Sequence, residues 1–529
     1  MSKRVITLGV VAALMVLAAS PAFAASRGTS FTPLGLFPLC GTVPEGEFCE
    51  SFPLTTVVGM TADGQTISGM HAFFQGGYLW TEDTGLQTVG PIDGALYISG
   101  SGNRVSSDSF DETYTYGYAA NWNGLFWTPE LTPDDIWTPI PLAEGFSFCD
   151  FSGQGTFGVS DDWIVGLTWL DLEGTGNGCR GARAFAWSEA TGTTVLDSSV
   201  NDDSTRANAV NDDGSVVVGW MQTNSREASK WVNGVQSFLC PDPSGLGGVN
   251  FCSEGWDVTP DGGLMLTSLA TLEDFNTRAT LVDQAGNYEQ LPFPDAFFDP
   301  FWDTFSGRAV SDDGNTVVGA FGGGGFFGSP PYPVVWNRDL GMTIDLQVFL
   351  LGQGLDDLFF WFLSDATAVN ADGTIIAGYG NNPDGWIEAY KVDISRVKVC
   401  HKPEGGGNGS NRTITIGWDG VADHLAHGDA LSTCEFALAD GHSRAMANRE
   451  AMVGTGHQDP SRDTRHGSME QIRQNQTRSQ QGGFGSTAVA SPYATNPAQS
   501  NPFVQSEGGQ SAAQREDLRN RIERSRDRK

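Results

Sequence analysis

The chain has 529 residues, of which 63 are Asp or Glu and 30 are Lys or Arg, so its formal net charge is −33 at pH 7. Residues 25–434 carry the excess, with 15 basic and 52 acidic side chains. Such an acidic body repels nucleic acid phosphates and anionic lipid head groups, which excludes both as expected partners but is compatible with cation binding.

The N-terminus has the pattern of a secretion signal. Lys3 and Arg4 provide a basic start, residues 5–19 are apolar, and residues 22–24 form a small-x-small cleavage site. We therefore predict cleavage after Ala24, with residues 1–24 as the signal and a mature chain that is secreted or held at the cell surface. No later segment has the ~18 consecutive apolar residues of a membrane span, so we expect no transmembrane segment in the mature chain.

The eight cysteines occur as four sequential pairs. An even count in an exported chain favours disulfides over thiol chemistry. Neighbour pairing is the simplest of the 105 connectivities that eight cysteines allow. It gives the predicted bonds Cys40–Cys49, Cys149–Cys179, Cys240–Cys252 and Cys400–Cys434.

Residues 308–346 contain the repeated unit of the chain. Four β-prone runs, at 308–311, 316–320, 333–337 and 342–346, are separated by turn signals such as Asp312-Asp313-Gly314-Asn315. Four strands joined by hairpins have two open edges and are only marginally stable alone. Such a unit needs copies of itself beside it.

Seven copies can be aligned on their turns, at positions 64, 102, 162, 214, 262, 314 and 373, with a mean spacing of about 51 residues. The copies are rich in Val, Ile, Thr, Trp and Gly and lack a 3.6-residue periodicity, which excludes helical repeats. Propeller blades of four strands run ~40–50 residues. We therefore predict an all-β fold, a β-propeller of seven four-stranded blades, over residues 25–394.

The N-terminal end of the predicted propeller contains an extra strand, and the last copy of the repeat lacks one. The last copy lacks a convincing fourth strand, whereas the isolated segment SFTPLGLFP at 30–38 precedes the first copy. An open outer edge promotes aggregation, so closing it is physically favourable. We predict that residues 31–36 pair with residues 388–392 of the last blade.

The repeats support a family resemblance. ARAFAW at 182–187 and RANAVNDDGSVVVGW at 206–220 resemble the HAF-type extracellular repeat family of bacterial secreted proteins. The resemblance covers roughly residues 30–394, and the second copy and the DDW at 161–163 depart from it. It implies an exported β-propeller and no established catalytic residues.

A different composition follows residue 394. Residues 395–436 form a small Cys/His module that resembles a Cys-flanked segment near the ends of bacterial secreted proteins, with a CHKP opening and an HLxHGDxLxxC close. Residues 437–529 are rich in Gln, Ser, Asn, Gly and Arg and lack the apolar residues for a core, so we predict a disordered tail.

The small module contains the candidate metal ligands of the chain. Two histidines three residues apart can share a metal with a ligand from a neighbouring strand. The predicted set is His401, His424, His427 and Asp429. The alternative is a disulfide-stapled fold in which these side chains cap and hydrogen-bond, because a module this small needs a disulfide or a metal such as Zn²⁺ but not both.

Two repeated features have alternative interpretations. The turn carboxylates could ligate Ca²⁺, but their spacing lacks the D-x-D-x-D-G pattern and favours ordinary turn chemistry. These residues are Asp212, Asp213, Asp312, Asp313 and Asp372. The aromatic residue of each third strand could stack on sugars, but its recurrence favours packing between blades. These residues are Trp80, Trp187, Trp231, Trp336 and Tyr390.

The aromatic segments 293–305 and 358–363 are the remaining candidates for ligand contact, with packing under a neighbouring loop as the alternative. No nucleophile elbow, phosphate loop or HExxH helix is present. We expect a monomeric, non-enzymatic binding or structural protein with an extracellular protein or glycan as partner. The alternative is an extracellular polysaccharide hydrolase or lyase on a propeller scaffold, to be recognised by carboxylates that converge with aromatic residues at the mouth of the ring.

Overall fold

A computed structural model describes the following residues: 28–37, 54–71, 76–89, 94–110, 115–121, 137–143, 154–169, 182–196, 204–222, 226–240, 252–270, 277–294, 304–322, 331–403 and 411–438. The predicted signal, the predicted bonds Cys40–Cys49 and Cys149–Cys179, and nearly all of the predicted tail lie outside these ranges.

Within the described ranges the strands form seven four-stranded antiparallel sheets and one two-stranded sheet. The first three sheets comprise β2 (Thr55–Met60), β3 (Thr66–His71), β4 (Gly77–Thr81) and β5 (Gly85–Thr88); β6 (Tyr97–Ile98), β7 (Arg104–Phe110), β8 (Thr115–Asn121) and β9 (Thr138–Pro139); and β10 (Gln154–Val159), β11 (Ile164–Trp169), β12 (Ala182–Ser188) and β13 (Gly192–Val195).

The next three sheets comprise β14 (Thr205–Val210), β15 (Val216–Gln222), β16 (Arg226–Val232) and β17 (Val235–Phe238); β18 (Cys252–Val258), β19 (Leu264–Ala270), β20 (Thr277–Asp283) and β21 (Tyr288–Gln290); and β22 (Phe305–Val310), β23 (Thr316–Phe321), β24 (Tyr332–Asn337) and β25 (Met342–Asp345). The last sheet joins β26 (Phe362–Val369), β27 (Ile375–Asn381) and β28 (Ile387–Asp393) to β1 (Ser30–Pro33).

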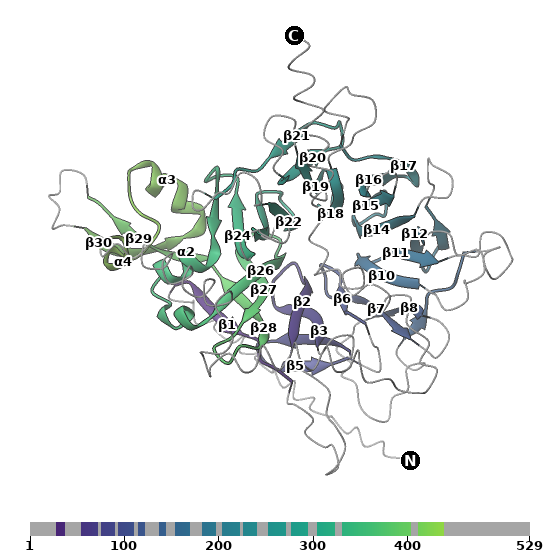
Figure 1. Ribbon diagram of the computed structural model, residues 1–529, viewed down its shortest axis with the longest axis horizontal. Helices are drawn as coiled ribbons and strands as arrows, with labels where there is room; N and C mark the ends of the chain where they lie inside the picture. Colours follow the sequence, from purple (N-terminus) through teal and green to yellow (C-terminus); the bar gives the residue numbers. More distant parts are fainter. Residues whose placement is uncertain are drawn as a thin grey trace, which may run out of the picture.

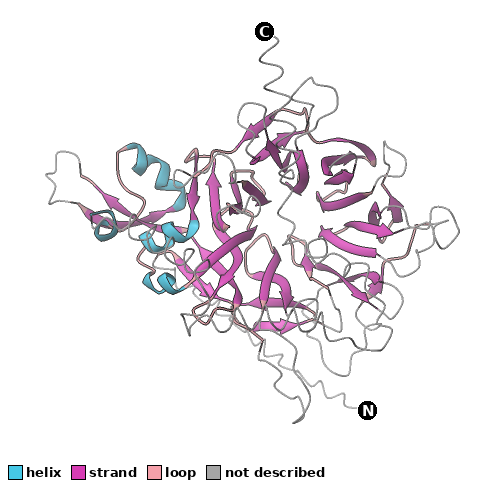
Figure 2. Ribbon diagram, viewed as in Figure 1, coloured by secondary structure: helices cyan, strands magenta, loops and turns pink. Residues whose placement is uncertain are grey.

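The sheets are arranged in a ring, with β2, β6, β10, β14, β18, β22 and β26 nearest the centre (Figure 1). Each sheet contacts the next, and β26 and β28 of the last sheet contact β2 of the first. Strands dominate and the few helices gather on one side of the ring (Figure 2). The predicted all-β propeller arrangement is confirmed.

The repeated sequence explains the hairpins. In the copy at 308–346, the four predicted runs coincide with β22 to β25 within a few residues. Gly314 has a φ of 71°, and the Asp313 carboxylate accepts the Asn315 N–H at 2.9 Å. Glycine adopts this left-handed conformation without a Cβ clash, and the carboxylate closes the turn.

The N-terminal strand closes the ring as predicted. β1 pairs antiparallel with β28, with Phe31 opposite Val392 and Pro33 opposite Tyr390. The pairing continues beyond β1, because the Leu34 N–H donates to the carbonyl of Ala389 at 2.9 Å. The last sheet therefore obtains its outer strand from the opposite end of the chain.

The aromatic residues of the third strands form the core between sheets. Each is at most 5% exposed, which confirms the packing interpretation; they are Trp80, Trp187, Trp231, Trp336 and Tyr390. In one cluster, for example, Trp336 packs with Leu266 and Leu281 of the preceding sheet. One large ring thus fills the space that sheet twist leaves between neighbours.

Two short helices separate the last two sheets in sequence. α2 (Leu346–Gly352) is buried at every position and is capped by Asp345, whose side chain accepts the Val348 N–H. It is followed by η1 (Asp356–Phe360). The predicted run 342–346 is therefore one residue too long, since Leu346 begins the helix.

Of the two alternatives for residues 358–363, ligand contact or packing, packing applies to most of the segment. Leu358, Trp361 and Leu363 are at most 6% exposed and pack with α2, whereas Phe360 is 71% exposed. The alternative of packing applies, because η1 folds back over the buried helix. Of the segment 293–305, Phe293 packs against Phe321 and Phe305 is buried, and residues 295–303 lie outside the described ranges.

Candidate functional site

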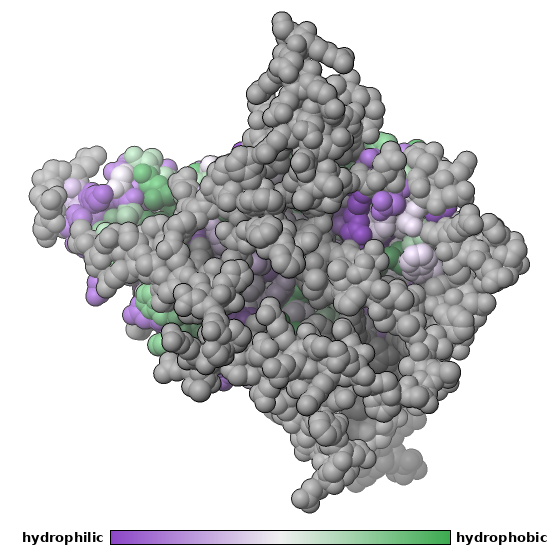
Figure 3. Space-filling model, viewed as in Figure 1, coloured by the Kyte–Doolittle hydropathy of each residue, from purple (hydrophilic) through white to green (hydrophobic). Residues whose placement is uncertain are grey.

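The C-terminal module is a short hairpin with small helices. It comprises β29 (Arg396–His401), β30 (Arg412–Gly417), η2 (Trp418–Gly420), α3 (Val421–Ala426) and α4 (Cys434–Leu438). Its buried Val397 and Val421 belong to the same apolar cluster as α2 and the last sheet. The module therefore shares its core with the propeller. On the face shown in Figure 3, its described surface mixes hydrophilic and hydrophobic residues.

The predicted disulfide between Cys400 and Cys434 is confirmed, and so is the one between Cys240 and Cys252 in the propeller. The first bond joins the end of β29 to the start of α4. It fixes His401, the next residue, at the end of the strand. The module thus has the staple that its small size requires.

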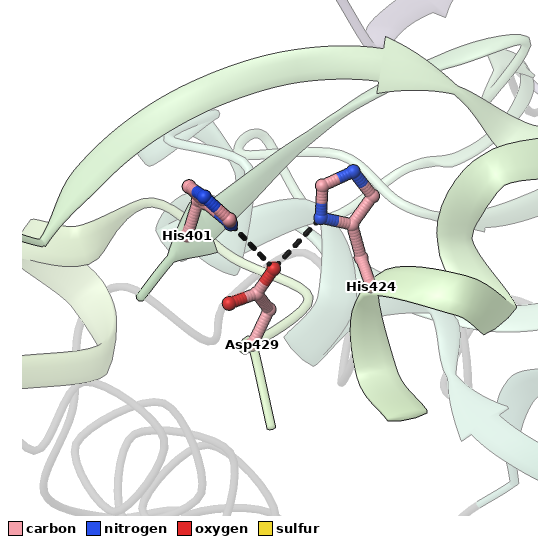
Figure 4. Close-up of side chains that lie close together, drawn as sticks. All are labelled: His401, His424 and Asp429. Atoms are coloured by element: carbon pink, nitrogen blue, oxygen red, sulfur yellow. Dashed lines mark hydrogen bonds and ion pairs between the residues drawn. The ribbon is translucent and has the colours of Figure 1, made fainter. Parts of the chain in front are cut away.

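Three of the four predicted metal ligands meet in the module. Nδ1 of His401 lies 2.8 Å and Nδ1 of His424 2.7 Å from the same oxygen, Oδ2 of Asp429. Both imidazoles point toward this carboxylate from different elements, β29 and α3 (Figure 4). One potential ligand atom from each side chain lies within 4.8 Å of the other two.

The backbone explains this convergence. α3 ends at Ala426, and Gly428, with a φ of 84°, turns the chain back so that the Asp429 N–H donates to the His424 carbonyl at 3.1 Å. The next residue, Ala430, exchanges backbone hydrogen bonds with Cys400. Asp429 is thereby placed between the helix and the strand that carry the two histidines.

The electrostatics favour an ionised carboxylate. The Asp429 side chain is fully buried, whereas each of the two histidine side chains is 25% exposed. Burial opposes ionisation, but hydrogen bonds from His401, from the Lys402 amide and from His424 outweigh it and hold the pKa of Asp429 well below its usual range. Two imidazoles are therefore oriented by one fixed negative charge.

The structure does not bring His427, the predicted fourth ligand, together with the other three residues. His427 is the residue after the last turn of α3, its side chain is exposed, and it is not part of the group. The i, i+3 spacing assumes a helix that continues through both histidines, and this helix ends between them. Among the described residues, the group of His401, His424 and Asp429 is the only one of its kind with ligand atoms close enough to share a metal.

A second group of charged side chains, which the sequence did not predict, is centred on carboxylates of the innermost strands. Glu254, 2% exposed, accepts hydrogen bonds from Arg206 of the preceding sheet, from Arg226 at 3.3 Å and from Asn208 at 2.8 Å. The only feature of the sequence that could have indicated this contact is the arginine in RANAV at 206–210, and it cannot be distinguished there from an ordinary residue of the repeat.

The same arrangement recurs two sheets further on. Arg308 of β22 donates from Nε to Oδ2 of Asp365 on β26 at 3.1 Å, and both side chains are at most 6% exposed. Aromatic rings cover these cations: the Arg206 guanidinium lies 4.7 Å from the Phe157 ring, and the Arg308 guanidinium lies 5.0 Å from the Trp256 ring. We call the contacts of Glu254 with Arg206 and Arg226, and of Asp365 with Arg308, the inner-strand ion pairs.

The two carboxylates differ in protonation behaviour. Burial opposes the charge of Glu254, but Arg206 and Arg226 outweigh it and lower its pKa. Burial dominates at Asp365, so its pKa is raised despite Arg308. Each carboxylate is hydrogen-bonded to an arginine of the preceding sheet, so each ion pair links two neighbouring sheets.

The turn carboxylates act in their turns as predicted. Asp213 accepts the Ser215 N–H at 2.9 Å, and Asp372 accepts the Thr374 N–H at 3.0 Å, as Asp313 does in its own turn. The first Asp of the pair is different. Burial, followed by neighbouring carboxylates, raises the pKa of Asp212 and of Asp312.

No helix among the described residues is long and apolar enough to cross a membrane.

No protein-family model matches the chain, and no curated protein matches it significantly. Solved structures similar to it include TolB from Acinetobacter baumannii, at 12% identity and a TM-score of 0.32, over 55% of this chain and 62% of that one. An oligogalacturonate lyase in complex with manganese is 12% identical, with a TM-score of 0.40, over 70% of this chain and 98% of that one.

The β-propeller domain of the Trilobed protease from Pyrococcus furiosus is 10% identical, with a TM-score of 0.37, over 56% of this chain and 84% of that one. The chain thus spans less than two thirds of the TolB chain. With TM-scores below 0.5, these likenesses carry no argument about what this chain binds or converts.

Proposed function

We propose that this protein is exported and acts outside the cell or at its surface as a non-enzymatic binding or structural protein. Its scaffold is a propeller in which each of the seven four-stranded sheets is one blade, related to the HAF-type extracellular repeat proteins. The apolar N-terminal segment, the two disulfides and the acidic composition support export. Its partner is an extracellular protein or glycan.

The inner-strand ion pairs carry the non-enzymatic part of this proposal. A glycosidase acid needs a raised pKa and a free path to the leaving group, and its second carboxylate must reach the sugar or a water. Glu254 instead accepts bonds from two arginines, and its pKa is lowered. Asp365, whose pKa is raised, is buried and bound to Arg308 across a blade boundary. Both carboxylates are engaged in structure.

One observation favours the alternative of a polysaccharide hydrolase or lyase. Glu254 and its partner Arg226 do lie beside an aromatic ring, because the Arg226 guanidinium is 4.4 Å from the Trp220 ring. The indole N–H of Trp220 is buried and has no hydrogen-bond partner among the described residues. Aromatic rings combined with a few polar or charged groups are typical of ligand pockets, which is the feature that the alternative requires.

The decisive test is turnover by the mature chain on a panel of neutral and acidic polysaccharides, beside Glu254→Gln and Asp365→Asn. We expect no product from any of the three, and a lower melting temperature for both variants, because each leaves a buried arginine without the negative charge of its partner. Turnover that disappears in either variant, at a temperature where that variant is folded, would replace our proposal with the alternative. Saturable glycan binding without product would identify the partner class.

A further inference from the structure

The two histidines and the aspartate of the C-terminal module lie outside the propeller sheets. His401, His424 and Asp429 come from a strand, a helix and the turn after that helix, and the chain brings their ligand atoms within 4.8 Å of one another. The geometry points to a site for one divalent transition-metal ion of the Zn²⁺ class. Its ligands are Nδ1 of His401, Nδ1 of His424 and Oδ2 of Asp429, with water completing the coordination.

The donor set fits this class of ion. Two imidazoles and one carboxylate with an open position are ligands that Zn²⁺ and its neighbours accept, whereas Ca²⁺ and Mg²⁺ prefer oxygen. Metal–ligand bonds of 2.0–2.1 Å place tetrahedral ligand atoms roughly 3.3 Å apart. The two imidazole–carboxylate contacts, at 2.8 and 2.7 Å, must therefore open by about half an ångström.

The surroundings allow this adjustment and admit the ion. Both histidine side chains are partly exposed, so an ion can enter from solvent and the rings can move. The carboxylate stays in place, because its other oxygen, Oδ1, accepts the Lys402 N–H at 2.7 Å. When the ion replaces the two hydrogen bonds, Nδ1 of each neutral imidazole binds the ion and Nε2 carries the proton.

If the metal served only to hold the module together, removing it would unfold the module. The Cys400–Cys434 bond and the core shared with α2 already hold the module, so its folding does not require a metal. We therefore expect chelation to leave the melting temperature of the ring unchanged, while the chain retains a saturable metal site. This inference is independent of the proposed extracellular binding role.

The test is a Zn²⁺ titration of the chelator-treated mature chain, with an excess of Mg²⁺ and Ca²⁺ to occupy nonspecific carboxylates. Co²⁺ substitution adds a visible absorption band that reports low-symmetry nitrogen and oxygen ligation. We expect one ion per chain. His401→Gln and His424→Gln retain a side-chain N–H for Asp429 but lose the imidazole, and should weaken binding by about 10–100-fold or more.

His427→Gln is the matched control, because this exposed histidine lies three residues from His424 and outside the group. It should leave the affinity and the Co²⁺ band unchanged. Peptide mapping of the Cys400–Cys434 bond verifies that each variant is folded. The assignment is overturned if the chain shows no saturable site, if the His401 and His424 variants bind as tightly as wild type, or if the His427 variant weakens binding equally.

Discussion

The glycine of the repeated VVG sequence is required by the packing of one backbone on another. A Cβ on Gly219 would lie 1.9 Å from the carbonyl oxygen of Arg206, and one on Gly319 would lie 2.0 Å from that of Ser306. In each sheet concerned, a register shift on the innermost strand, between Ala207 and Ala209 in β14, brings the two strands this close. Each glycine therefore accommodates a β-bulge.

We expect Gly219→Ala to destabilise the protein by about 1–3 kcal/mol, because the added methyl group must displace a hydrogen-bonded strand. Gly100→Ala is the control, since its Cβ would meet nothing closer than 3.8 Å. Denaturant unfolding followed by Trp fluorescence measures both. Equal unfolding midpoints for the two variants would show that β14 can shift to make room for the methyl group without loss of stability.

The Asp257 carboxylate should make the stability of the protein fall as the pH rises, which is the opposite of the usual effect of a folded-state Asp. Burial raises its pKa to about 6, and its two oxygens accept the N–H groups of Val258 and, in the next sheet, of Val310. A folded-state pKa above the unfolded value means that the favourable contribution is complete at low pH. That contribution is lost as the pH rises from the ordinary Asp value near 4 through 6.

The melting temperature of Asp257→Asn, relative to wild type, should therefore rise as the pH increases from 4 to about 6. Asp261→Asn is the control of opposite sign: hydrogen bonds from Thr259 and Gly263 lower the pKa of Asp261, so its contribution is present above the ordinary Asp value and lost only in acid. Differential scanning calorimetry across this range checks the sign. A constant difference for Asp257→Asn would place its folded pKa outside the range.

At the scale of elements, β1 determines whether the ring is closed. Besides pairing with β28, Phe31 packs against Trp361 and Tyr390, with ring centroids 5.2 and 5.6 Å away. Deleting residues 25–38 removes these contacts and exposes the edge of β28. The melting temperature of the whole ring should fall in one cooperative transition, measured by circular dichroism.

Phe31→Ala separates packing from pairing in the same experiment. It keeps the strand but loses the aromatic contacts, and should lower stability by less than the deletion does. A deletion variant that melts like wild type, with only local exchange at β28, would show that closure contributes nothing to the ring.

Gln353, at the C-terminal end of α2, links the propeller to the C-terminal module. Its side-chain amide donates to the carbonyl of Lys398 at 3.1 Å and accepts the Lys398 N–H at 2.5 Å, and the residue is 1% exposed. It also accepts from Thr29, just before β1, at 3.2 Å. One buried amide thus joins α2, β29 and the N-terminal segment.

Gln353→Ala should leave the partly buried N–H and carbonyl of Lys398 without these partners, at a cost of about 1 kcal/mol. Hydrogen exchange in β29 should accelerate, while exchange in β14 to β17 should not change. The exposed Gln65, which bonds only within its own turn, supplies the control Gln65→Ala. Unaltered exchange in β29 of the Gln353 variant would mean that the shared apolar core alone fixes the module.

At the scale of the whole molecule, charge determines which polymers the surface accepts. Residues 25–434 hold 52 acidic and 15 basic side chains, whereas residues 439–529 hold 10 acidic and 13 basic ones. Counterion release favours DNA binding only where cationic side chains neutralise phosphates. The mature chain shortened at Leu438 should therefore not retain duplex DNA even at low salt. Salt-sensitive retention in a mobility-shift assay would contradict this, and comparison with the full mature chain isolates the contribution of the tail.

The sequence by itself determined the repeated unit, its turns and its closure. Turn residues, strand propensity and alternation act over a few neighbours, so Gly314 with Asp313, the buried Trp336 and the pairing of residues 31–36 with the last blade could all be predicted. Cys400–Cys434 followed from the same local logic, because the two cysteines bracket one short module.

Only the tertiary structure decided which side chains meet. Arg206 and Glu254 lie 48 residues apart and occupy neighbouring sheets, so their contact depends on ring geometry and on a bulge that no local pattern specifies. His424 and His427 have the spacing of a shared site, but α3 ends between them, and a helix end depends on the packing that follows it. The burial of α2 likewise could not be predicted from its own sequence, because it depends on packing against the C-terminal module. Contacts between elements depend on relative placement, which a one-dimensional periodicity cannot encode.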